Sequence, residues 1–200
     1  MAERRNKEQI RKLTLASVFT ALIVILAFTP IGYLRVGVVS ITFIPIPVVI
    51  GAILGGPAMG ALLGAVFGAT SFIQCFGMDA FGTTLFSINP FFTAIMCFIP
   101  RILMGLFCAL IFKALSGKIK NTVITYGITS LSGGVLNTIM FVGVLVLLFG
   151  KSEYLSNFGS SIPAIIGTLI TFNAVIEWIA CLVIGTAVSK AISALMRHHL

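Results

Sequence analysis

Charged residues are scarce in this chain, and histidine is almost missing from it. Asp, Glu, Lys and Arg make up 9% of the 200 residues, whereas they make up roughly a quarter of an ordinary soluble domain. Hydrophobic residues account for 58%. This composition excludes a soluble globular protein and predicts an integral membrane protein. We expect residues 1–200 to form a single membrane domain, because several spans leave no room for a separate soluble one.

Motifs for covalent chemistry, metal binding and ATP hydrolysis are missing as well. The sequence has no H-E-x-x-H and no G-x-S-x-G motif, and its first histidine is His198. Its four cysteines are scattered through apolar segments without the spacing of metal ligands, so we interpret them as packing residues. Ser116-Gly117-Lys118 is not a phosphate-binding loop, because the upstream glycine is missing. We therefore expect a protein that is not an enzyme, without catalytic residues, metal or cofactor.

What the sequence does contain is a series of long apolar segments, which predict six membrane spans. The fold class that we predict is an all-α integral membrane protein with a compact six-helix transmembrane bundle. A basic segment at 1–12 precedes spans at about 13–31, 40–54, 58–76, 91–115, 123–149 and 162–189. Mixed polar connections at 77–90 and 150–161 are long enough to fold over the mouth of a cavity.

Two of these spans have unusual sequences. In the second, Pro45 and Pro47 delay the helix, and Gly55-Gly56-Pro57 stops it after about 8 residues. Irregular backbone at this depth is tolerated only where protein covers it or where it lines a cavity. In the third, glycines recur at four-residue spacing on one helix face, namely Gly60, Gly64 and Gly68. That face should touch another helix closely.

The net charge of +8 comes from basic residues at the ends of apolar runs and not from one basic face. This distribution argues against nucleic acid as a partner. It fits the rule that Lys and Arg in short loops stay on the cytoplasmic side. With both termini cytoplasmic, the basic residues inside are Arg4, Arg5, Lys7, Arg11, Lys12, Lys113, Lys118, Lys120, Lys190 and Arg197, and those outside are Arg35 and Lys151. We therefore predict cytoplasmic termini and a lipid bilayer around the bundle.

Arg101 and Glu177 are the only charges deep inside the apolar spans. An ionisable side chain at the bilayer centre costs at least about 2.5–3.5 kcal/mol, so its presence indicates a functional site. With a rise of 1.5 Å per residue, Arg101 lies roughly 15 Å and Glu177 roughly 22 Å from the outer ends of their spans. Asn137 and Asn173 fall at similar depths, and Asn173 is one helical turn from Glu177. These residues predict a polar cluster near the midplane of the membrane.

The cluster has a structural alternative. Arg101 and Glu177 could pair with each other and lock the bundle, and Asn137 could be an interhelical hydrogen-bond clip. If at least one of the charges instead contacts a ligand, the cluster is a binding site. Trp178 lies about 100 degrees around the helix from Glu177 and is expected to pack or to face lipid.

Several segments occur in a characteristic order. They are the basic start followed by residues 13–22, Ser40-Ile41-Thr42 leading through Ile44-Pro45 to Ile50-Gly51-Ala52, Gly56-Pro57 with the Gly60 and Gly64 stripe, Pro100-Arg101 followed by Gly105, and Asn173 with Glu177. In order and spacing these segments resemble the substrate-binding S component of energy-coupling factor (ECF) vitamin transporters. The resemblance covers essentially the whole chain.

This resemblance implies a six-helix protein of a bacterial plasma membrane that binds a vitamin in a cavity near the outer face, under outer loops. It implies as partners a transmembrane coupling protein (EcfT-like) and two cytoplasmic ATPases, and release of the vitamin inward by toppling in the membrane. The missing phosphate-binding loop agrees with a subunit that has no energy source of its own.

The resemblance also implies a docking patch on the first helix. The family docks on its coupling protein through small residues at A-x-x-x-A spacing, and small residues there permit close backbone approach. The possible frames in this chain are Ala16 with Thr20 and Ser17 with Ala21, neither of which is a full alanine pair. The face with Gly60 and Gly64 is a second candidate surface.

One residue, Arg101, limits the range of candidate substrates. A buried Arg101 suits a ligand with a carboxylate, and the sequence is similar to the branch with pantothenate-type S components, so pantothenate is the first expectation. If Glu177 neutralises Arg101, this argument falls away. Riboflavin, folate, cobalamin and thiamin precursors remain alternatives.

Two other classes of protein stay open. One is a stand-alone ion-coupled secondary transporter of a small solute, although such carriers usually show two related halves with matched broken helices, and the irregular second span has no obvious partner. The other is a scaffold in the membrane that takes part in no transport and binds no small molecule.

Overall fold

The computed structural model describes residues 2–30, 32–36, 39–158, 161–169 and 172–198. Within these ranges, five helices are long and apolar enough to cross a membrane. They cover Glu8–Ala27, Pro57–Gln74, Pro90–Ser116, Thr122–Phe149 and Ala174–Leu195. The predicted helical membrane architecture is confirmed at this level.

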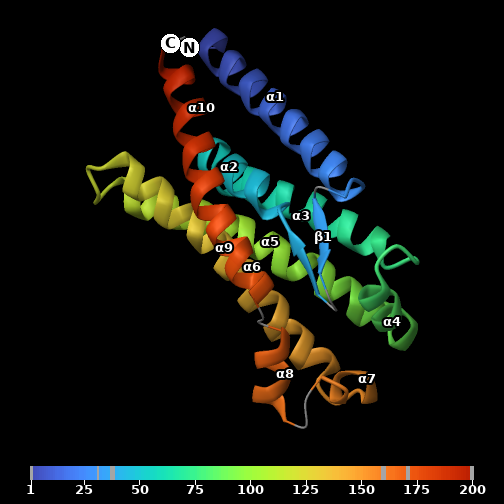
Figure 1. Ribbon diagram of the computed structural model, residues 1–200. Coiled ribbons are helices and arrows are strands. Elements are labelled where there is room, and N and C mark those ends of the chain that lie inside the picture. Colours follow the sequence, from blue (N-terminus) through green and yellow to red (C-terminus); the bar gives the residue numbers. More distant parts are fainter. Residues whose placement is uncertain (1, 31, 37–38, 159–160, 170–171, 199–200) are drawn as a thin grey trace.

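The elements in chain order are α1 (Ala2–Ala27), β1 (Tyr33–Val36), β2 (Val39–Thr42), α2 (Pro45–Gly55), α3 (Pro57–Gln74), α4 (Ala80–Ile88), α5 (Pro90–Ser116), α6 (Thr122–Phe149), α7 (Glu153–Ser156), α8 (Ile162–Leu169), α9 (Phe172–Ala180), the π-helical turn η1 (Cys181–Gly185) and α10 (Thr186–His198). The start of α1 and the end of α10 lie at one end of the molecule, and α4, α7 and α8 lie at the other (Figure 1). The molecule therefore has a terminal end and a loop end.

Side-chain caps fix where several helices begin. Asp79 accepts a hydrogen bond from the backbone N–H of Gly82 at 2.7 Å and starts α4, and Asn89 accepts one from Phe92 at 3.1 Å and starts α5. Such caps satisfy backbone donors that have no partner inside the helix. The segment 77–90, predicted as a loop, therefore contains a helix, because the capping residue Asp79 begins a new helix soon after α3 ends.

The second predicted span is only half a helix. Residues 40–42, which were predicted to begin this span, belong to β2, and β2 pairs antiparallel with β1. This hairpin lies outside the predicted all-α fold class, and its β-branched residues fit a strand. The helix itself runs only from Pro45 to Gly55, and its residues from Pro45 to Ile53 are buried. Gly56, with a φ of 83°, provides the left-handed turn into α3 that favours glycine.

The last predicted span, 162–189, contains several helical elements. They are α8 over Ile162–Leu169, α9 from Phe172, the turn η1 and the first part of α10. Residues 170 and 171, between α8 and α9, lie outside the part of the chain that the structure describes. Among the described residues, the stretch that is long and apolar enough to cross a membrane covers Ala174–Leu195.

Helices α3 and α5 pack backbone against backbone. A Cβ atom built on Gly60 would lie 2.2 Å from the carbonyl oxygen of Gly105, and one built on Gly64 would lie 2.2 Å from that of Arg101. Only glycine permits this approach. The close helix contact predicted from the glycine spacing is confirmed, and the partner is α5 of the same chain.

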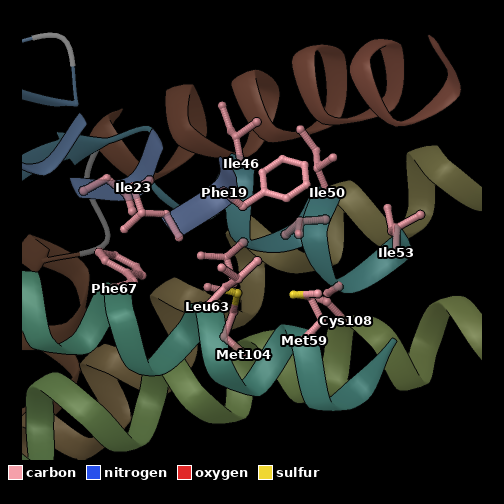
Figure 2. Packing of buried hydrophobic residues seen from close by; sticks show 14 of the residues in the cluster. Phe19, Ile23, Ile46, Ile50, Ile53, Met59, Leu63, Phe67, Met104 and Cys108 are labelled. Carbon is pink, nitrogen blue, oxygen red and sulfur yellow. The ribbon is translucent and has the colours of Figure 1, made fainter. Parts of the chain in front are cut away.

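Two apolar clusters hold the bundle together. The central cluster joins α1, α2, α3, α5, α6 and η1. Figure 2 shows its members Phe19, Ile23, Ile46, Ile50, Ile53, Met59, Leu63, Phe67, Met104 and Cys108. The end cluster joins α4, α5, α6 and α7 and consists of Cys75, Leu85, Met96, Cys97, Val142, Leu145, Phe149 and Leu155. All four cysteines are buried in this apolar packing, which confirms their interpretation as packing residues.

The C-terminal end of α1 is tied to α3 by a polar contact. The side chain of Gln74, which is buried, donates a hydrogen bond through Nε2 to the carbonyl oxygen of Ala27 at 2.5 Å. Ala27 is the last residue of α1, where carbonyl groups lack helical partners. The rest of the spanning part of α1 is largely exposed, so this helix lies at the edge of the bundle.

Candidate binding site

Arg101 lies in a polar layer between the two apolar clusters. Only 9% of its surface is exposed. The carbon centre of its guanidinium group lies 5.3 Å from the ring centroid of Phe67, a member of the central cluster, and 4.6 Å from that of Phe141, which packs on the end cluster. A cation held between aromatic rings in this way is stabilised by their negative faces.

One end of the guanidinium group is anchored to the backbone of its own helix. Nη1 of Arg101 donates a hydrogen bond to the carbonyl oxygen of Met96 at 2.6 Å. The side chain therefore runs back along α5 toward the loop end of the molecule. Hydrogen bonds from a charged donor are stronger than hydrogen bonds between neutral groups.

Glu177 is buried as well, with 6% of its surface exposed. Its Oε1 atom accepts a hydrogen bond from Nδ2 of Asn137 at 2.8 Å. The carboxylate also accepts a hydrogen bond from the backbone N–H of Thr42, the last residue of β2. The acidic side chain thus connects α6, α9 and the hairpin.

Arg101 and Glu177 form no direct ion pair in the part of the chain that the structure describes. They are near enough to interact electrostatically. The connection between them runs along α6, where Asn137, bound to Glu177, is one helical turn from Phe141, which lies over Arg101. A purely structural Arg101–Glu177 pair, as the sequence allowed, is not what these residues form.

Two buried polar atoms of the layer have no hydrogen-bond partner among the described residues. They are Nε of Arg101, a donor with positive charge, and Oδ1 of Asn137, a neutral acceptor. Buried groups of these types normally have partners. The layer can therefore give a charged hydrogen bond to an anion and accept one from a hydroxyl or amide group.

The other predicted site residues are distributed differently. Asn173 belongs to α9, but its side chain lies outside the part of the chain that the structure describes. Trp178 is half-buried and donates a hydrogen bond from Nε1 to Oγ1 of Thr138 at 3.1 Å. It packs against Gly134, which confirms the packing role expected for it.

The residues predicted for docking lie on two different surfaces. On α1, Ser17 and Ala21 are exposed, and Ala16 and Thr20 are half-buried. Gly60 and Gly64 are buried and face the backbone of α5. That glycine face is occupied inside the chain itself.

Sequence reasoning missed the aromatic and backbone partners of the site. Phe67 and Phe141 are two of 17 phenylalanines, and nothing in the sequence marks them except that Phe141 follows Asn137 by one turn. The role of the Thr42 backbone could not be found, because any residue except proline has an N–H group. Within the described residues, no three or more His, Cys, Asp or Glu side chains are grouped to hold a metal.

Comparisons with known proteins agree with these features. Residues 11–189 match the family described as "ECF transporter, substrate-specific component". The pantothenic acid transporter PanT of Lactococcus lactis subsp. cremoris is 28% identical over 163 residues, which cover 76% of this chain and 77% of that protein. The pantothenate transporter PanT of Leuconostoc mesenteroides subsp. mesenteroides is 30% identical over 203 residues and covers 94% of each chain.

The family match includes every element that forms the polar layer, from the hairpin to α9. The helices of membrane length agree with a transport role in a cell membrane. The chain therefore belongs to the substrate-specific components of ECF transporters and is a multi-pass membrane component of a transporter.

Proposed function

We propose that this chain is the vitamin-binding S component of an ECF-type importer and that it captures pantothenate. The observation that carries the proposal is the state of Arg101, a buried cation that no carboxylate of the described residues pairs with. A buried charge of this kind is stabilised by an anionic partner. The similarity to two proteins named as pantothenate transporters supports the choice of anion.

The polar layer has groups that complement pantothenate. We assign its carboxylate to Arg101, whose Nε is an unpaired donor, and a hydroxyl or amide N–H to Oδ1 of Asn137, an unpaired acceptor. Glu177 already accepts hydrogen bonds from Asn137 and Thr42, so we assign it chiefly to the orientation of these groups. Asn173, one turn before Glu177, is assigned to the same site by its place on α9.

We further propose that α2 counts as a sixth, shortened span in a single membrane domain and that both termini are cytoplasmic. The basic residues near the two ends and between α5 and α6 support this orientation. The hairpin, α4 and α7 then face outward. Phe81 of α4 lies 5.9 Å from Tyr154 of α7 between ring centroids, so the two outer connections touch.

The partners in this proposal are a transmembrane coupling protein and two cytoplasmic ATPases, whether dedicated to this chain or shared with others. We place the docking patch on α1, at Ala16, Ser17, Thr20 and Ala21, because this helix is largely exposed and carries small residues there. The face with Gly60 and Gly64 is not carried into the proposal, because α5 covers it. Toppling in the membrane would release the vitamin inward.

The direct test is mass spectrometry of the small molecules released from gently purified protein. We expect pantothenate, because a tight binder retains its substrate through purification. Recovery of riboflavin, folate, cobalamin or a thiamin precursor instead would keep the S-component proposal and reject the substrate. Recovery of no vitamin, with no shift of thermal stability on addition of any of them, would contradict the proposal of a vitamin site.

A second experiment separates the proposal from an ion-coupled secondary transporter. The chain alone in liposomes should bind pantothenate without accumulating it under a proton or sodium gradient. Uptake should require the coupling protein, the ATPases and ATP. Gradient-driven uptake by the chain alone would reject the S-component mechanism.

A further inference from the structure

We propose that Pro100 is a positioning residue for Arg101, because the N–H group that proline lacks leaves the Met96 carbonyl free to hold the guanidinium group. This inference rests on the proposed function in one respect, that Arg101 contacts the ligand. The juxtaposition itself is a feature of α5 and does not depend on the identity of the ligand.

The argument begins with the hydrogen bonds of an α-helix. The N–H of each residue bonds to the carbonyl oxygen four residues earlier, so the carbonyl of Met96 would normally pair with the N–H of residue 100. Residue 100 is a proline inside α5 and has no N–H group. In its place, Nη1 of Arg101 donates to that carbonyl oxygen at 2.6 Å. The gap left by one residue is filled by the side chain of the next.

The backbone that presents this carbonyl is held firmly. A Cβ atom on Gly64 would meet the carbonyl oxygen of Arg101 at 2.2 Å, and one on Gly68 would meet that of Cys97 at 2.9 Å. This turn of α5 therefore lies directly on the backbone of α3. Met96 itself is buried in the end cluster. The acceptor is thus fixed in space before any ligand binds.

With Nη1 bound at one end and two aromatic rings near its carbon centre, the guanidinium group is held in place. Phe67 and Phe141 lie 5.3 and 4.6 Å from its carbon centre. Its Nε remains a buried donor without a partner among the described residues. A side chain held in its binding geometry loses less conformational freedom on binding, which raises affinity.

The test uses Pro100→Ala, which gives residue 100 an N–H group that competes with Arg101 for the Met96 carbonyl. Pantothenate affinity should fall by about three- to tenfold, the effect of weakening one hydrogen bond to a charged group. Affinity for pantothenol, in which a hydroxymethyl group replaces the carboxylate, should change little. The matched control is Pro90→Ala at the start of the same helix, where an N–H group has no helical partner, and it should leave both affinities unchanged.

A double-mutant cycle separates positioning from a general effect on the helix. In an Arg101→Met background, Pro100→Ala should cause no further loss of pantothenate affinity, because there is no guanidinium group to position. An equal loss in both backgrounds would show that proline acts only through helix shape and would overturn the inference. If Pro100→Ala does not accumulate, Pro100→Val restores the N–H group with nearly the volume of proline and takes its place.

The same cycle without ligand distinguishes failure of this inference from failure of the proposed function. In ligand-free protein, Pro100→Ala should raise the thermal midpoint more in the Arg101→Met background than in the wild type. In the Arg101→Met background the Met96 carbonyl has no guanidinium donor, so the new N–H group of residue 100 supplies a missing hydrogen bond. Equal shifts would reject the coupling between Pro100 and Arg101. Unequal shifts in a protein that binds no pantothenate would reject the proposed substrate and keep the coupling.

Discussion

Arg101 and Glu177 are buried in the same layer, yet each has its own set of partners. The cation has aromatic rings and one backbone carbonyl, whereas the anion has an amide group and a backbone N–H. Desolvating two charges is expensive, and a direct pair would offset part of that cost. With the two charges apart, Nε of Arg101 has no partner among the described residues, which is what the proposed contact with a ligand carboxylate requires.

Replacing Arg101 by methionine should weaken pantothenate binding by about ten- to a hundredfold, the value of a hydrogen bond to a charged group. The protein should still fold, because an apolar side chain of similar length removes the desolvation cost of the charge. Binding by titration calorimetry and thermal unfolding in detergent measure the two effects. Lys151→Met, at an exposed position in the connection after α6, is the control for general attraction of anions. Equal losses in both variants would contradict a direct contact.

Exchanging the amide and the acid between Asn137 and Glu177 tests their contact. Asn137→Asp places a second carboxylate against Glu177, in place of a hydrogen bond of 2.8 Å. We expect a loss of stability of about 1–3 kcal/mol, the cost of leaving a buried polar group unsatisfied. The double variant Asn137→Asp with Glu177→Gln restores an amide facing an acid and should recover most of the thermal midpoint. No recovery would mean that the two positions do not interact.

The predictability of these residues depends on how rare their type is. Arg101, Glu177 and Asn137 could be found because charge and amide groups are uncommon in apolar spans. Phe67 and Phe141 could not, since phenylalanine is common in this chain and its contact with a cation depends on side-chain geometry.

At the scale of elements, the contact between α3 and α5 has no side chain between the two backbones. Gly64→Ala should destabilise the protein by at least about 1–3 kcal/mol, as overpacking does, because the added methyl group would meet a backbone carbonyl that cannot rotate away. Gly143→Ala is the matched control, a helical glycine of α6 whose added Cβ meets nothing within 4 Å. It should be neutral or slightly stabilising, since alanine favours helix more than glycine. The midpoints of thermal unfolding of Gly64→Ala and Gly143→Ala measure the difference. Similar midpoints for the two variants would contradict this packing.

The boundaries of elements were predictable where glycine or proline marks a turn, and they were not predictable elsewhere. Gly55-Gly56-Pro57 indicated the turn between α2 and α3, and the glycine spacing indicated a close helix contact. The hairpin was missed because its short strands sit inside a generally apolar stretch, where hydropathy favours a span.

At the scale of the whole molecule, α1 is the most exposed of the long helices, since only 17% of its most apolar stretch is buried. A leucine at Ser17 or Ala21, both exposed, should leave pantothenate binding intact and abolish transport, because bulk there prevents close approach of a partner helix. Binding to the purified chain and uptake by cells with the complete transporter measure the two. Leu22→Phe, at an exposed position about 100 degrees around the helix from Ala21 and about 140 degrees from Ser17, should affect neither. Retained transport in the leucine variants would move the docking surface elsewhere.

The half-helix α2 has a consequence for how the protein is made. At about 16 Å it is far shorter than the roughly 30 Å of bilayer hydrocarbon. Its residues from Pro45 to Ile53 are covered by other elements of the protein instead of by lipid. We expect such a segment to be inserted together with α3, which follows it after a single glycine turn, and to be held in place only once α5 and α6 are present, because it packs against all three helices. Nascent chains that end before α5 should therefore expose α2 to proteases, although its residues are among the most deeply covered in the finished protein.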